Sequence, residues 1–149
     1  MTVAAIGNYL MRDDGVAIHV LNALHQECPP DDVVVDLLDV GTAPDMSACM
    51  ETDVDKLVII DAVQGHGEPG AIYRFTPDVF ESESGDVTSA HDLNLKQSLA
   101  MMRLAGTLPP EVIVIGVEPA TMEMGVTLSP DVAGKLPEIV AAVLREIRQ

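Results

Sequence analysis

The sequence Leu57-Val58-Ile59-Ile60-Asp61 lies near the middle of the chain and indicates the architecture most directly. Four consecutive apolar residues are typical of a strand that is buried on both faces, as in the centre of a parallel sheet. Asp61 follows this run directly, and burial of a carboxylate is costly unless the group is paired, hydrogen-bonded or bound to a metal. Both a structural cap on the next loop and a functional role are compatible with this position.

Strand and helix patterns alternate along the rest of the chain, which predicts an open α/β sheet with helices on both faces. We expect one domain over residues 1–149, a three-layer sandwich with a five-stranded, mostly parallel twisted sheet. Only a short loop precedes the strand at 71–76, so that strand is expected to be antiparallel. The other expected strands are 3–6, 33–38 and 112–117, and the expected helices are 15–27, 42–50, 92–105 and 130 to about 147.

The net charge of the chain limits the classes of molecule that are expected to bind it. The chain has 8 basic and 24 acidic residues, a net charge of −16. Nucleic acids and anionic membrane surfaces both reward positive charge, so neither is expected as a partner. The charge is compatible with a basic protein segment as substrate, and equally with solubility or life in high salt. The absence of a long apolar run and of a basic, signal-like start predicts a cytoplasmic protein, and we expect a monomer.

Three polar side chains are predicted to meet at the carboxyl edge of the sheet, where ligands of such folds bind. Asp14 follows the first strand after a short loop, Asp61 comes directly after the third, and His91 opens the helix at 92–105. Two carboxylates and an imidazole form a plausible divalent-metal site. Asp13 and Asp14 could also cap the helix that follows them. Adjacent side chains diverge by about 100°, so we expect a functional role for one of the two.

Other classes of protein agree less well with the sequence. Phosphoacceptor receiver domains also place an acidic pair and an acceptor aspartate here, but they need a lysine after the fifth strand, and residues 112–119 contain none. Gly7 and Gly15 do not form the G-x-G-x-x-G pattern of dinucleotide-binding folds, and the chain has no HExxH zinc-protease motif.

Five short motifs occur in order along the chain. They are Gly7-Asn8-Tyr9-Leu10-Met11-Arg12-Asp13-Asp14-Gly15, Asp39-Val40-Gly41-Thr42-Ala43, Val58-Ile59-Ile60-Asp61-Ala62, Ser89-Ala90-His91-Asp92-Leu93, and Gly116-Val117-Glu118-Pro119 followed by Leu128-Ser129-Pro130. Together they resemble the motifs of the hydrogenase maturation endopeptidases, a family that trims the C-terminal extension from the large subunit of nickel–iron hydrogenases.

The resemblance implies an endopeptidase whose partner is a hydrogenase large-subunit precursor. It assigns the catalytic and metal-contacting roles to Asp14, Asp61 and His91, although relatives often have Glu at the first position. The nickel would be supplied by the substrate, and Zn, Cd or Ni could mimic it in the isolated protein. An aspartic-type and a metal-dependent mechanism both stay open. A non-catalytic metal-binding or chaperone-like relative on the same scaffold is the alternative.

A second set of residues follows the second strand. Asp39, Gly41 and Thr42 are expected to lie at the same edge of the sheet, and we assign them to substrate recognition. The simpler interpretation is turn chemistry, with Gly41 at the bend and Thr42 as a helix N-cap.

Overall fold

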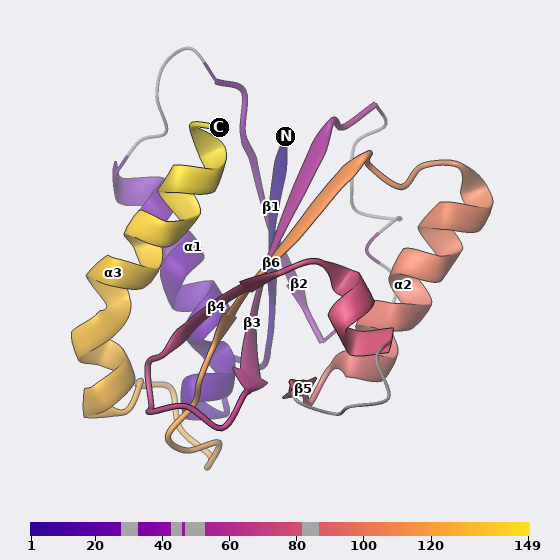
Figure 1. Cartoon of the computed structure of the whole chain (residues 1–149). Coiled ribbons are helices and arrows are strands. Elements are labelled where there is room, and N and C mark those ends of the chain that lie inside the picture. The colour runs from indigo at the N-terminus through magenta and orange to yellow at the C-terminus, as the bar shows by residue number, and fades with distance from the viewer. Residues whose placement is uncertain (28–32, 43–45, 47–52, 82–86) are drawn as a thin grey trace.

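The computed structural model describes residues 1–27, 33–42, 46, 53–81 and 87–149, and Figure 1 shows the arrangement of their elements. The sequence predicted alternating strands and helices, but in the described part of the chain the strands between residues 36 and 75 follow one another without an α-helix. The strands are β1 (Thr2–Ile6), β2 (Asp36–Gly41), β3 (Lys56–Gln64), β4 (Ile72–Phe75), β5 (Thr88–Ser89) and β6 (Glu111–Val117). The helices are α1 (Val16–Glu27), α2 (Asp92–Ala105) and α3 (Pro130–Ile147), with 3-10 turns η1 (Arg12–Gly15) and η2 (Pro77–Glu81).

The main sheet has the order β2-β1-β3-β6-β4. β1, β2, β3 and β6 run parallel, and β4 is antiparallel to β6. The predicted α/β class is therefore confirmed, as is the antiparallel direction of β4. The reason given for that direction was wrong, because β6 lies between β3 and β4 and the two are not hydrogen-bonded neighbours. The expected number of strands was also wrong, since β5 adds a sixth by pairing antiparallel with the end of β3.

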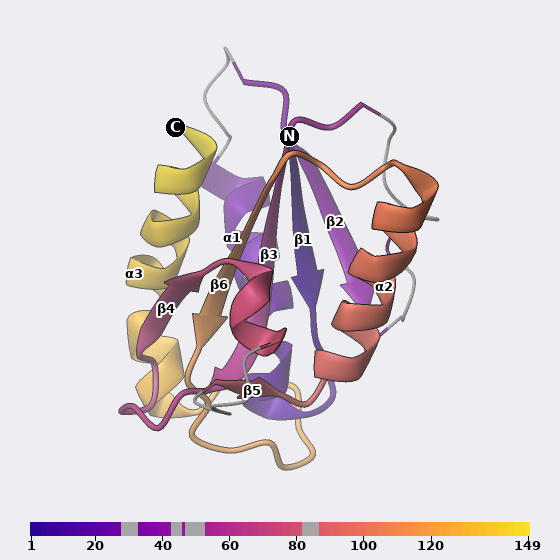
Figure 2. The same cartoon turned by 45° about the vertical axis from the view of Figure 1, so that its right-hand side comes forward.

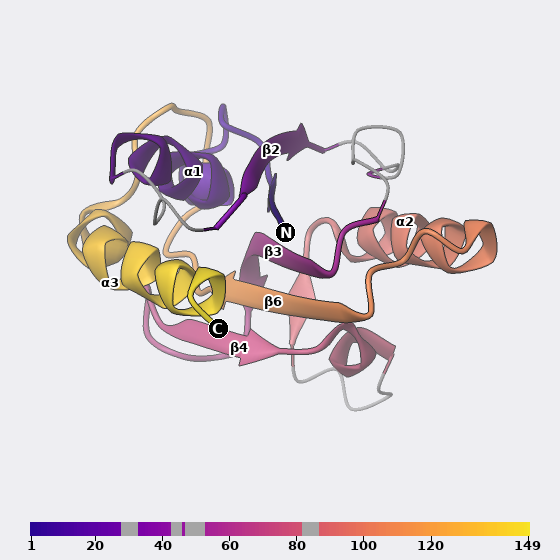
Figure 3. The same cartoon turned by 90° about the horizontal axis from the view of Figure 1, so that it is seen from above.

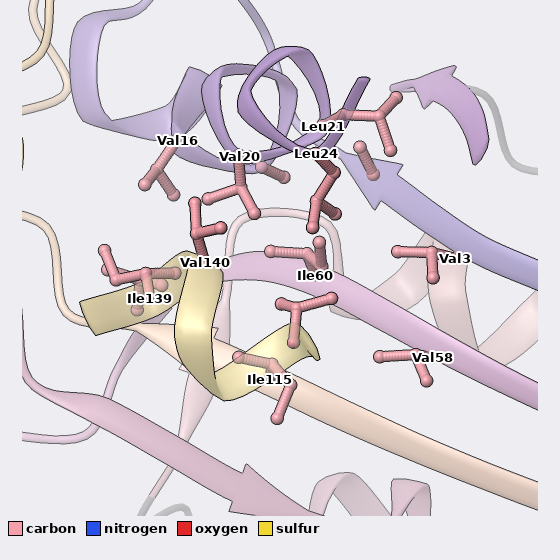
Figure 4. Packing of buried hydrophobic residues seen from close by; sticks show 14 of the residues in the cluster. Val3, Val16, Val20, Leu21, Leu24, Val58, Ile60, Ile115, Ile139 and Val140 are labelled. Atoms are coloured by element: carbon pink, nitrogen blue, oxygen red, sulfur yellow. The ribbon is translucent and has the colours of Figure 1, made fainter. Parts of the chain in front are cut away.

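Helices cover both faces of the sheet, with α1 and α3 on one side and α2 on the other (Figures 1 and 3). β3 is buried along its length except at Gln64, as expected of a central strand. Its side chains alternate between the two layers because successive residues of a strand face opposite ways. Val58 and Ile60 pack into the core that α1 and α3 cover (Figure 4), whereas Ile59 packs into the core beneath α2.

The helix ends follow local signals in the sequence. α2 ends at Gly106, which has a left-handed backbone (φ 72°) and donates its N–H toward the carbonyl oxygen of Arg103. α3 begins after Ser129, whose Oγ accepts a hydrogen bond from the N–H of Val132 at 3.4 Å. Both boundaries agree with the prediction. No helix in the described part of the chain is long and apolar enough to cross a membrane.

Two predicted elements differ from the structure or fall outside it. β2 was expected at 33–38 but spans Asp36–Gly41, because its pairing with β1 starts at Asp36 opposite Thr2. Val33 and Val35 pack against the core without belonging to the strand, which explains why their apolar character was misleading. Most of the helix expected at 42–50 falls on residues 43–45 and 47–52, outside the described residues.

Candidate active site

Asp14, Asp61 and His91 come together at the carboxyl edge of the sheet. This edge is the lower one in Figure 2. Asp14 lies in η1 after β1, and His91 occupies the N-cap position of α2 without a capping hydrogen bond from its side chain. Asp61 was expected directly after the third strand but lies within β3, which continues to Gln64. His91 Nε2 lies 3.1 Å from both carboxylate oxygens of Asp14. The relative exposures of Asp14, Asp61 and His91 are only 5%, 0% and 7%. The edge therefore holds a compact, buried acidic and imidazole group.

Two glycines allow the loop after β1 to fold tightly enough to present Asp14. A Cβ added to Gly7, which has φ +152°, would lie 2.1 Å from the backbone oxygen of Asp14. A Cβ on Gly15 would lie 2.9 Å from the Cα of Tyr9. Asn8 then donates its backbone N–H to Asp14 Oδ2 at 3.0 Å. The loop thus fixes the orientation of the carboxylate that faces His91.

Asp13 and Asp14 have different roles. Asp13 is fully buried, and its Oδ2 accepts hydrogen bonds from the N–H groups of Ala120 and Thr121 and from the hydroxyl of Ser129. Its Oδ1 accepts the N–H of Ser129 at 2.7 Å. Asp13 therefore holds residues 120–129 against η1, whereas Asp14 turns toward His91. The expectation that one of the pair serves the site stays a prediction, and this geometry favours Asp14.

Asp61 is a buried carboxylate with incomplete hydrogen bonding. Ser89 Oγ donates to Asp61 Oδ2 at 2.5 Å, whereas Oδ1 has no hydrogen-bond partner in the part of the chain that the structure describes. Burial raises the pKa of Asp61 to about 7, although the Ser89 hydrogen bond acts in the opposite direction. In contrast, buried Glu146 is paired with Lys56 at 3.3 Å. A carboxyl group whose pKa lies near 7 can accept or release a proton at neutral pH.

The neighbouring carboxylate of Asp14 stabilises the protonated form of His91. The hydrogen bond with Asp14 raises the pKa of His91 above its ordinary value, and burial opposes this rise. The backbone N–H of His91 also donates to Ser89 Oγ at 3.0 Å. Ser89 is thus a positioning residue that joins Asp61 to the backbone of His91. Ser89 belongs to one of the sequence motifs but had no predicted role, although its position two residues before His91 suits a hydroxyl that bonds back to the turn.

The donor types fit a borderline transition metal such as nickel, because imidazole and carboxylate are both suitable ligands. Within the described residues, no three His, Cys, Asp or Glu side chains are arranged to hold an ion. Here His91 Nε2 is engaged with Asp14, and Asp61 Oδ2 with Ser89. An arriving metal ion would therefore compete with the His91–Asp14 hydrogen bond, while Asp61 Oδ1 could accept a contact without losing one.

Substitution of Ser89 tests its positioning role. Ser89→Ala is expected to slow the reaction of this site about tenfold, because Asp61 and His91 lose a common hydrogen-bond partner. Loss of the Ser89 bond also raises the pKa of Asp61, so any rate that depends on its ionised form should move to higher pH. A pH–rate profile measures this shift, and Ser89→Thr should restore it. An unchanged profile for Ser89→Ala would mean that Ser89 serves the fold alone.

The residues assigned to substrate recognition lie at the C-terminal end of β2, since Asp39 and Gly41 belong to the strand and Thr42 follows it. Asp39 and Thr42 are exposed, and Asp39 Oδ1 accepts the N–H of Gly41 at 2.9 Å, as turn chemistry requires. Gly41 has φ +60°, and its carbonyl accepts the N–H of Gly7. Asn94, in the first turn of α2, donates to the carbonyl of Thr42 at 3.1 Å. This turn therefore lies beside the start of α2, and its recognition role stays a prediction.

Two residues near the edge have roles that sequence reasoning missed. Glu118, at the end of β6, is buried, and its Oε2 accepts hydrogen bonds from Gly65 N–H and Tyr73 OH, both at 2.7 Å. It therefore fixes the loop after β3. His19, in α1, is partly buried, and its ring centroid lies 5.2 Å from that of Tyr9. The role of Glu118 could have been suspected from the sequence, because an acidic residue directly follows an apolar strand there.

Comparisons with known proteins agree with this architecture. The family model described as HycI, hydrogenase maturation protease, matches residues 18–146. The chain is 28% identical over 148 residues to Hydrogenase 2 maturation protease of Escherichia coli (strain K12), covering 99% of this chain and 90% of that protein. It is 29% identical to the coenzyme F420 hydrogenase subunit delta of Methanothermobacter thermautotrophicus, covering 97% and 92%.

Solved structures give the same result. The hydrogenase maturating endopeptidase HybD from E. coli superposes with a TM-score of 0.81 at 29% identity, covering 99% of this chain and 91% of that one. The NiFe hydrogenase maturation protease HybD from Thermococcus kodakarensis superposes with a TM-score of 0.83 at 26% identity, covering 98% and 97%. Fold and relatives together define an α/β peptidase. The chain belongs to the hydrogenase maturation protease family, as its motifs predicted.

Proposed function

We propose that this endopeptidase removes the C-terminal extension of a nickel–iron hydrogenase large-subunit precursor after nickel has been inserted. The observation that carries the proposal is the buried Asp61, whose Oδ1 lacks a partner among the described residues, beside the Asp14–His91 pair. The names of the relatives support the substrate class. In this proposal Asp14, Asp61 and His91 contact the metal ion that the precursor carries, so the ion belongs to the substrate.

The surroundings of the site suit a protein substrate. Exposed apolar side chains are concentrated on the segments that surround it: the loop after β1, the start of α2 and the loop after β6. Such a patch around a polar centre is typical of a surface that contacts another protein. The residues are Tyr9, Leu10, Leu93, Met124 and Val126.

Hydrogen bonds hold two of these segments together. Gly125 N–H donates to the carbonyl of Leu10 at 2.8 Å, and Arg12 N–H donates to the carbonyl of Gly125 at 2.8 Å. The two loops therefore present their apolar side chains on a fixed backbone. We infer that a folded precursor, rather than an unstructured peptide, docks on this surface, because a preorganised surface loses little entropy on binding.

Incubation with a precursor tests the proposal. Nickel-loaded precursor should lose a C-terminal fragment, detectable by mass spectrometry, whereas precursor without nickel and unrelated unfolded proteins should stay intact. His91→Ala should reduce cleavage at least about 100-fold, because the site loses both a proton carrier and a metal-contacting group. Full cleavage by His91→Ala would exclude the assigned site. Binding of the precursor without any cleavage by the wild-type protein would instead favour the non-catalytic relative.

A further inference from the structure

A cavity of about 320 Å³ lies away from the candidate active site, between α2, η2 and the start of β6. Its volume falls within the range of small-ligand pockets, about 300–1,000 Å³. Apolar side chains from α2 and β6 line much of it, and prolines lie on both sides. We call it the α2 pocket, and its apolar lining includes Leu99, Leu108, Val112, Ile113, Pro77 and Pro109.

Two cations also line the α2 pocket, although the chain has only 8 basic residues against 24 acidic ones. Lys96 and Arg103 are exposed and seven residues apart on α2, so they share one helix face about 10 Å apart along the axis. Neither forms an ion pair with any residue that the structure describes.

The acidic residues of the pocket already have partners. Glu111 lies 3.1 Å from the ammonium group of Lys56, and Asp78 accepts a hydrogen bond from the hydroxyl of Thr76. The hydroxyl of Thr76 leaves the negative charge of Asp78 in place, so the described lining offers two cations without an ion pair against one such carboxylate, above an apolar floor. This combination suits a carboxylate attached to an apolar body, since Lys and Arg form charge-assisted hydrogen bonds with carboxylates.

α2 connects the pocket to the candidate active site. His91 occupies the N-cap position of this helix, and Lys96 and Arg103 lie about 8 and 18 Å further along the axis. An extended peptide covers these distances with about three to six residues, at roughly 3.3 Å each. A C-terminal extension also ends in a carboxylate by its chemistry. The pocket is thus within reach of a segment whose other end is at the site.

We propose that the α2 pocket binds the carboxyl-terminal end of the extension that the enzyme removes. Lys96 and Arg103 contact the terminal carboxylate, and the apolar floor receives the side chains that precede it. This inference rests on the proposed function for its occupant. It adds a binding site that recognises the end of the precursor chain, separate from the residues that act on the scissile bond.

Nuclear magnetic resonance can test binding without cleavage. A peptide with the sequence of the precursor's last residues, added to ¹⁵N-labelled enzyme, should shift the amide signals of Lys96–Arg103 and Thr76–Asp78. The same peptide with a C-terminal amide should bind about tenfold more weakly, because it lacks the charge that the cations contact. Equal binding of acid and amide, or shifts confined to other residues, would overturn the proposal.

Kinetics on the full precursor complete the test. Arg103→Glu should raise KM at least about tenfold and leave kcat unchanged, because it repels the carboxylate without altering the catalytic group. Lys96→Glu should act in the same direction. Arg145→Glu is the matched control, since Arg145 is exposed on α3, on the other face of the sheet, and its KM should stay at the wild-type value. An unchanged KM for both α2 variants would overturn the proposal.

The two hypotheses fail in different ways. If the wild-type enzyme cleaves no nickel-loaded precursor, the proposed function is wrong, whatever the pocket binds. If cleavage proceeds but the pocket variants behave like the Arg145 control, only the pocket assignment is wrong. Binding of small carboxylates such as 4-phenylbutyrate, without any effect of the α2 variants on KM, also excludes the extension as occupant.

Discussion

Asp61→Asn is expected to reduce precursor cleavage by about 100-fold or more and, above neutral pH, to increase the stability of the protein. Burial raises the pKa of Asp61 from 3.8 to about 7. When folding raises the pKa of a carboxyl group, that group contributes its full stabilisation of the folded state only at pH values below its pKa in the unfolded chain. That contribution is lost as pH rises through about 7, so ionised Asp61 opposes folding at pH 8. The ionised carboxylate of Asp61 therefore lowers the free energy of unfolding of the protein.

The size of the effect follows from the same pKa. A rise of roughly three units corresponds to about 4 kcal/mol at high pH. An amide that leaves a buried N–H without an acceptor costs about 1–3 kcal/mol, so the net gain should be about 1–3 kcal/mol. For a protein of this size, this raises Tm by roughly 2–12 °C. Asp61→Asn should also reduce cleavage by about 100-fold or more, as loss of a group that carries protons does.

Urea unfolding at several pH values provides the measurement. The stability difference between Asp61→Asn and wild type should grow from pH 4 to pH 7 and become constant above it. Asp55→Asn is the control, because Asp55 is exposed at the opposite end of β3 and should change neither stability nor cleavage. A variant that is less stable than wild type at pH 8 would contradict the assignment of Asp61 as a destabilising buried carboxylate.

Local signals made much of the fold predictable. β3 was recognisable because a strand buried on both faces needs apolar residues throughout. Gly106 and Ser129 marked helix ends through conformations and hydrogen bonds that only a few residue types supply. β5 was not predictable, since two residues, Thr88 and Ser89, carry no periodicity, and their strand character comes from pairing with β3. The neighbour of β4 likewise depends on long-range packing that no local pattern encodes.

The candidate site was predictable to the level of segments. The rule that parallel strands collect ligands at their carboxyl ends placed Asp61 and His91 at one edge, and the structure brings them there. It could not choose between Asp13 and Asp14, because both follow the same turn and only the position of residues 120–129 separates their roles. Ser89 was missed for a similar reason, since a hydroxyl shows its role only when its partners are placed in space.

The adjacent aspartates should respond to substitution in opposite ways. Asp13→Ala removes the acceptor of four hydrogen bonds, from the N–H groups of Ala120, Thr121 and Ser129 and from the Ser129 hydroxyl. Buried donors left without an acceptor cost about 1–3 kcal/mol each, and these are not additive, so the loss in unfolding free energy should be about 3–5 kcal/mol.

Asp14→Asn, in contrast, keeps an oxygen that can accept the N–H of Asn8. Its stability should stay within about 1 kcal/mol of wild type, because one neutral hydrogen bond replaces a charged one. Its cleavage of nickel-loaded precursor should fall by about 100-fold or more, because His91 loses the carboxylate that raises its pKa. Urea unfolding and mass spectrometry measure the two effects on each variant. If Asp13→Ala were as stable as wild type, or if Asp14→Asn cleaved normally, the division between a residue that anchors the loop and one that serves the site would be wrong.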